Sequence, residues 1–75
     1  MCGIIGISSN KSVSANIINS LKKLEYRGYD SAGIATISDG QINELKSEGR
    51  VDRLEENFNL KNLKGNIGIG HVRWA

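Results

Sequence analysis

Two spacings of hydrophobic residues divide the first third of the chain into a strand and a helix. Residues 4–7 form a short β-branched run, which predicts a fully buried strand. The polar residues 8–12 that follow form a turn that can also supply a helix cap, so we expect a helix to begin near Ser12. Its apolar residues recur at helical spacing, at Val13, Ile17, Ile18, Leu21 and Leu24. Because this stripe is narrow, the helix should lie on a sheet.

A β-hairpin is the clearest signal in the middle of the chain. Residues 31–38 change from small to β-branched side chains, as is typical of a strand. The pair Asp39 and Gly40 then favours a two-residue hairpin turn. The chain should therefore return as an antiparallel strand over residues 41–46.

The remainder of the chain predicts a short helix and a last strand. Gly49 ends the hairpin, and a short surface helix follows within residues 50–58, with one apolar face made of Val51, Leu54 and Phe58. Residues 59–66 form a polar connector anchored by Leu60 and Leu63. Residues 65–74 predict a strand whose glycines let another backbone come close.

The predicted order of elements is strand, helix, two antiparallel strands, short helix and strand. This order favours an α+β fold in which a helix is layered on a largely antiparallel sheet. The continuous apolar run at 4–7 indicates burial on both faces, so the sheet needs a second covering layer. Because 75 residues do not contain that layer, we expect the chain to be part of a larger domain.

Composition and charge exclude several classes of protein. Hydrophobic residues make up 39% of the chain and charged residues 24%, which is the composition of a folded protein. The net charge of +2 is small and dispersed, which argues against a nucleic-acid or membrane surface. With one cysteine and one histidine, we expect no disulfide, no metal and no cofactor, and a cytoplasmic location.

The cysteine itself, Cys2, directly follows the first methionine. Removal of Met1 would leave a residue that carries both a thiol and a free α-amine, and the amine can act as the base for the thiol. No separate histidine is then required, and Gly3 leaves room for a substrate. The alternative is that Cys2 is a small buried residue near a frayed terminus.

Three stretches resemble the N-terminal-nucleophile glutamine amidotransferases, namely residues 1–7, 24–35 and 68–75. Together they span essentially the whole chain, and their order is far more specific than any one of them. The resemblance implies an α-β-β-α sandwich, of which residues 1–75 are the N-terminal part of the glutaminase domain. The remainder of that domain and the sugar isomerase domain would lie outside this sequence.

Within that family, the sequence is similar to the branch that transfers ammonia from L-glutamine to fructose 6-phosphate, which forms glucosamine 6-phosphate. Amidophosphoribosyltransferases, the nearest rival branch, favour His-Arg-Gly-Gln where this chain has residues 26–30, and Arg-Tyr-Ser-Thr where it has residues 73–75. The resemblance implies an aminotransferase of hexosamine biosynthesis that forms a homodimer.

The resemblance also assigns roles to four residues. Cys2 is the nucleophile that attacks the side-chain amide of glutamine and forms a glutamyl thioester. Arg73 matches an arginine that binds the α-carboxylate, which a guanidinium can do through two charge-assisted hydrogen bonds. Trp74 matches a tryptophan that gates the route of ammonia, and Arg27 matches an arginine close to the nucleophile.

Plain structural interpretations stay open for these residues. Arg73 can be a solvated arginine at a strand end, Trp74 can fill a core, and Arg27 can bind the carbonyls at a helix end. His71 is better explained as structural than as catalytic or metal-bound.

The other groups of the family's site lie beyond Ala75. They are a Thr-His-Gly sequence, an Asn-Gly pair for the oxyanion and an acid for the substrate amine. Because loss of one oxyanion donor costs about a hundredfold in rate or more, we expect the chain alone to hydrolyse glutamine negligibly. The alternative function is that of an inactive remnant that binds a partner or self-associates through its unfinished sheet.

Overall fold

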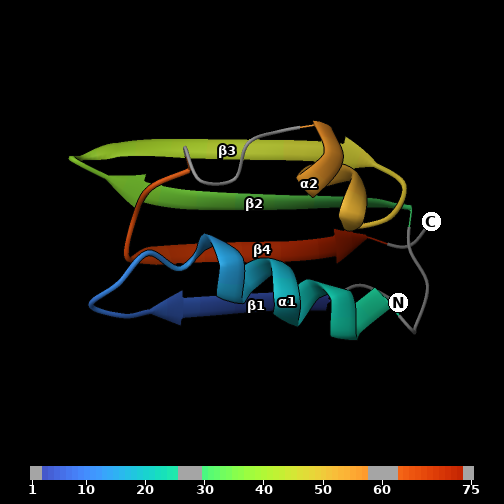
Figure 1. The fold of residues 1–75 in the computed structure, drawn as a ribbon, viewed down its shortest axis with the longest axis horizontal. Helices are drawn as coiled ribbons and strands as arrows, with labels where there is room; N and C mark the ends of the chain where they lie inside the picture. The colour runs from blue at the N-terminus through green and yellow to red at the C-terminus, as the bar shows by residue number, and fades with distance from the viewer. Residues whose placement is uncertain (1–2, 26–29, 58–62, 74–75) are drawn as a thin grey trace.

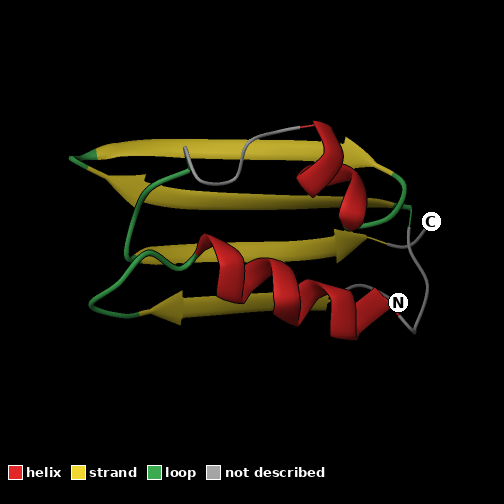
Figure 2. Ribbon diagram, viewed as in Figure 1, coloured by secondary structure: helices red, strands yellow, loops and turns green. Residues whose placement is uncertain are grey.

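A computed structural model describes residues 3–25, 30–57 and 63–73 of the chain. Its elements are β1 (Gly3–Ser8), α1 (Ser14–Leu24), β2 (Ser31–Ser38), β3 (Gln41–Glu48), α2 (Asp52–Asn57) and β4 (Ile67–Arg73). This is the predicted order of strands and helices. The strands form one antiparallel sheet in the order β1-β4-β2-β3. Both helices lie on the same face of this sheet (Figures 1 and 2).

The core lies between the helices and the sheet. The predicted stripe of α1 is confirmed, because four of its five residues are buried and Leu24 is partly buried against them. The strands contribute Ala32, Ile34 and Val72, and the second half of the chain adds Val51, Leu54 and Leu63. Phe58 and Leu60, which the sequence pattern assigns to the same core, lie outside the described residues.

The beginning of α1 differs from the prediction. The helix begins at Ser14, and the N-cap position is occupied by Val13, which makes no side-chain hydrogen bond as a cap. Instead, the backbone N–H of Val13 donates to the carbonyl of Gly65 at 3.0 Å. The polar residues 8–12 therefore do not cap the helix, and a contact from a distant part of the chain fixes its first turn.

The hairpin between β2 and β3 is confirmed. Asp39 and Gly40 have positive φ angles of 53° and 76°, as the two central residues of a type I′ turn require. Ser38 is paired with Gln41 across the turn. The returning strand continues past the predicted end at Lys46 to Glu48.

Among the described residues, no helix or strand covers the face of the sheet opposite the helices. Five large hydrophobic side chains are exposed there, namely Ile4, Ile37, Ile42, Ile67 and Ile69. The prediction of a fully buried first strand is therefore wrong for this chain, since Ile4 is 79% exposed while Ile5 and Ile7 pack towards the core. The open face is, however, what we expect of a sheet that lacks its second layer.

The glycines of β4 let α1 approach the sheet closely. A Cβ atom on Gly70 would lie 2.4 Å from Cγ2 of Ile17, and one on Gly68 would lie 2.8 Å both from Cδ1 of Ile17 and from the carbonyl oxygen of Ala35. The predicted close approach of another backbone is therefore found at Gly68 and also at Gly65, where a Cβ atom would lie 2.5 Å from the carbonyl oxygen of Ile37, whereas Gly70 faces only side chains of α1. Neither described helix has the length and apolar character needed to cross a membrane.

Candidate functional site

The first and third sequence motifs meet at one end of the sheet. Gly3, which follows Cys2 in the sequence, is paired with Val72, which precedes Arg73. Arg73 is exposed at the end of β4 and is paired on its other side with Ser31 of β2. Three predicted site residues, Cys2, Arg27 and Trp74, lie outside the described residues. Of the four, only Arg73 can be placed.

The open face changes in character along the strands. At the end that holds Arg73, the paired residues across β3, β2 and β4 are Glu48, Ser31 and Arg73, followed by Lys46, Gly33 and His71. At the opposite end, the corresponding row is Ile42, Ile37 and Ile67. Polar and charged side chains therefore lie beside the candidate substrate-binding arginine, whereas three isoleucines form the row at the opposite end.

His71 lies at this polar end and packs against the backbone of β2. It is half-buried, and a Cβ atom on Gly33 would lie only 2.5 Å from its Nε2 atom, so the imidazole rests directly on the Gly33 backbone. This contact supports the structural interpretation of His71. A hollow of about 210 Å³ opens beside it, lined by Ser31, Ala32, Lys46, Ser47, Glu48 and His71. No group of three or more metal-ligating side chains occurs within the described ranges.

A backbone hydrogen bond from Asp30 joins the second sequence motif to Arg73. The N–H of Asp30 donates to the carbonyl of Arg73 at 2.7 Å, and the N–H of Gly49 donates to the carbonyl of Asp30 at 2.7 Å. Asp30 is thereby joined to the end of β4.

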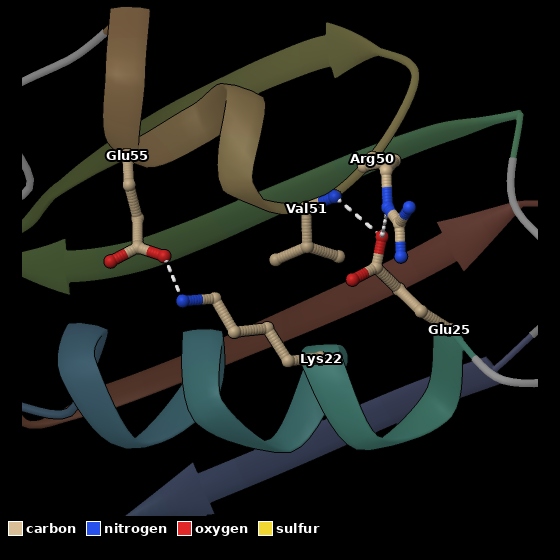
Figure 3. Close-up of polar contacts among 5 residues, drawn as sticks. All are labelled: Lys22, Glu25, Arg50, Val51 and Glu55. Carbon is tan, nitrogen blue, oxygen red and sulfur yellow. Dashed lines mark hydrogen bonds and ion pairs between the residues drawn. The ribbon is translucent and has the colours of Figure 1, made fainter.

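Glu25, which ends α1, is not a functional candidate on sequence grounds. Its side chain is only 10% exposed, and its Oε2 atom accepts a hydrogen bond from the backbone N–H of Val51 at 2.8 Å (Figure 3). The same oxygen lies 4.0 Å from Nε of Arg50. The one available signal is spacing, since Glu25 follows the buried Leu21 by one helical turn and therefore shares its face.

A second polar contact joins the two helices. The ammonium of Lys22 forms an ion pair with Glu55 of α2, with both side chains 42% exposed (Figure 3). Its hydrogen bond to Glu55 raises the pKa of Lys22 above the ordinary value of 10.5. Because this pair lies in the helix layer and not on the open face, we assign it to the scaffold.

Comparison with known proteins shows a similarity that covers the whole chain. No family model matches it. A curated protein from Bartonella henselae, named glutamine--fructose-6-phosphate aminotransferase [isomerizing], is 53% identical over all 75 residues. A protein of the same name from Pyrococcus horikoshii is 55% identical over the same length. The chain spans only 12% of the length of these curated relatives.

The fold also matches solved structures. The glutamine phosphoribosylpyrophosphate amidotransferase from B. subtilis, complexed with ADP and GMP, superposes with a TM-score of 0.89 at 28% identity. A structure described as the allosteric regulatory enzyme of purine biosynthesis gives a TM-score of 0.88. Each match covers 100% of this chain and 16% of the other chain. The predicted α+β class is confirmed by these matches.

Proposed function

We propose, from the premise that this chain belongs to the N-terminal-nucleophile glutamine amidotransferases, that it is the nucleophile-bearing segment of a glutaminase domain. The complete enzyme would hydrolyse L-glutamine and transfer the ammonia to fructose 6-phosphate, which yields glucosamine 6-phosphate. The observation that carries this proposal is the 53% identity, over every residue of the chain, to a relative named for that reaction. The rival amidophosphoribosyltransferase assignment is less well supported, because the identity to that enzyme is only 28%.

In the proposed reaction, Cys2 becomes the N-terminal residue after Met1 is removed. Its α-amine accepts the thiol proton, and the thiolate attacks the side-chain amide carbon of glutamine. Collapse of the tetrahedral intermediate breaks the C–N bond, and the departing nitrogen takes the proton and leaves as ammonia. Water then hydrolyses the thioester, which releases glutamate and restores the thiol.

Arg73 would hold the α-carboxylate of glutamine during this reaction. Its position on the open polar end of the sheet supports the role, and so does the register that pairs Gly3 with Val72, because these residues adjoin Cys2 and Arg73 in the sequence. Arg27 would lie close to the nucleophile, and Trp74 would gate the path of ammonia. We further propose that the complete enzyme is a cytoplasmic homodimer.

A chimera tests the proposal. This chain would replace the matching 75 residues of the Bartonella henselae relative, and release of glutamate from glutamine would be measured. We expect an active chimera, and we expect Cys2→Ala to reduce its rate by at least about a thousandfold, because the covalent step is lost. Lys11→Ala, at an exposed position that follows the end of β1 opposite the site, is the control. A chimera that keeps full activity without the Cys2 thiol would contradict the mechanism.

A second candidate function applies to the chain on its own. Its open face exposes five isoleucines, and β1 and β3 are the edge strands of the described sheet, each paired with a strand on one side only. Both features favour association with a second copy of the chain.

A further inference from the structure

We propose that Glu25 is a positioning residue for the candidate glutamine site. It holds the turn at residues 49–51, and this turn holds the backbone of Arg73. This inference rests on the proposed function. It concerns a residue at the end of a helix that touches neither the substrate nor the reacting atoms.

The first link in this connection is the carboxylate of Glu25. Its side chain is 10% exposed, and it accepts the Val51 N–H at 2.8 Å, with the Arg50 guanidinium 4.0 Å away. A hydrogen bond that involves a charged group in a mostly buried position is among the stronger ones in proteins. Glu25 therefore fixes the turn at residues 49–51 against the end of α1 (Figure 3).

Two backbone hydrogen bonds carry the connection from the turn to Arg73. Gly49 donates to the carbonyl of Asp30 at 2.7 Å, and Asp30 donates to the carbonyl of Arg73 at 2.7 Å. Gly49 has a φ of 90°, a conformation that side-chain-bearing residues rarely adopt. The turn thus has a defined shape, and Glu25 and Gly49 hold its two ends.

This arrangement joins two residues of the second sequence motif, Glu25 and Asp30, to one turn. Glu25 precedes and Asp30 follows the residues that include Arg27, and each is bonded to the turn at residues 49–51. Arg73, the proposed carboxylate-binding residue, is therefore attached through Asp30 to the same turn that Glu25 holds. A shift of about 1 Å in such a turn is enough to weaken substrate positioning severely.

Lys22 provides a matched control, because its ion pair with Glu55 joins the same two helices without taking part in this connection. If Glu25 only held α2 to α1, loss of either contact would have a similar effect. If Glu25 positions the site, only its own replacement should affect glutamine binding.

The first test uses the chimera that carries this chain. We expect Glu25→Ala and Glu25→Asp, whose shorter side chain withdraws the carboxylate, to raise the KM for glutamine about tenfold while kcat changes less than about threefold. Glu25→Gln keeps an acceptor oxygen and should stay within about threefold of the parent KM, as should Lys22→Met. The inference is overturned if Glu25→Asp leaves KM unchanged, or if Lys22→Met raises it equally.

The second test uses the 75-residue chain itself and needs no activity. Amide hydrogen exchange at Asp30 and Gly49 should be at least about tenfold faster in Glu25→Ala than in Lys22→Met, because the turn is released. Equal exchange rates in the two variants would overturn the inference. An inactive parent chimera together with faster exchange would reject the proposed function while leaving the connection from Glu25 to Arg73 intact.

Discussion

At the scale of single residues, Gly70 shows how closely α1 rests on the sheet. A Cβ atom there would lie 2.4 Å from Cγ2 of Ile17 and 3.0 Å from Cδ1 of Leu21. We expect Gly70→Ala to lower the free energy of unfolding by about 1–3 kcal/mol, because an overpacked core must shift to make room. Chemical denaturation of the 75-residue chain measures this loss.

Gly6 on β1 is the matched control for that substitution. The nearest atoms to a Cβ at Gly6 are 3.9 Å and 4.0 Å away, and its position is exposed. Gly6→Ala should therefore change stability by less than about 1 kcal/mol, and reduced freedom of the unfolded chain favours a gain. Equal losses for the two variants would show that contact with α1 is not the reason for glycine at position 70.

The sequence is informative about single residues only where a local motif or pattern fixes their role. Arg73 can be singled out because it stands in a recognisable motif, and the structure places it at the expected strand end. Glu25 cannot, because a glutamate at a helix end is usually solvated and its partner, Val51, lies 26 residues further along the chain. Hydrogen bonds between distant segments leave no periodic signal.

At the scale of elements, the Lys22–Glu55 ion pair gives a prediction with a defined pH dependence. The pKa of Lys22 is raised by its hydrogen bond to Glu55, so the pair contributes fully below the unfolded-state value of about 10.5 and is lost as pH rises through the higher folded-state value. Because both side chains are 42% exposed, the contribution at pH 8 should be about 0.5 kcal/mol or less.

Denaturation of Lys22→Met at several pH values measures this contribution. The difference in unfolding free energy from the parent should be present at pH 8 and should shrink above the ordinary lysine pKa of 10.5. Lys23→Met, which removes the same charge from the neighbouring position of α1 but leaves the Lys22–Glu55 pair in place, is the control. A difference for Lys22→Met that grows with rising pH would contradict a raised lysine pKa in the folded state.

Elements that are fixed by residues close together in the sequence are predicted well. Elements that depend on contacts between distant segments are predicted less well. The hairpin follows from the need for two positive φ angles at Asp39 and Gly40, which the sequence itself supplies. The first turn of α1 is misplaced in the prediction because Val13 is fixed by the carbonyl of Gly65, a residue on the far side of the hairpin in the sequence. The order of strands within the sheet likewise depends on pairing that no single segment specifies.

At the scale of the whole molecule, the apolar pattern at the start of the chain does not by itself predict which side chains are exposed. The run at residues 4–7 indicates burial on both faces, but the described elements cover only one of them, which leaves Ile4 exposed. The pattern of side chains fits a sheet that is covered on both faces, and among the described residues the helices cover only one. The exposed isoleucines are therefore an expected property of the isolated chain.

That property leads to a test of the isolated chain. The exposed isoleucines form one apolar surface beside two edge strands, so the 75-residue chain should self-associate as its concentration rises, which sedimentation velocity would detect. The double variant Ile37→Thr/Ile69→Thr keeps residues that favour strands and should remain monomeric with nearly unchanged stability, because both positions are about half exposed.

Ile17→Thr, at a fully buried position, is the control, and it should destabilise the fold without removing the open apolar surface. A parent chain that stays monomeric at high concentration would show that the open face does not drive association, and self-association undiminished in the double variant would place the contact elsewhere on the molecule.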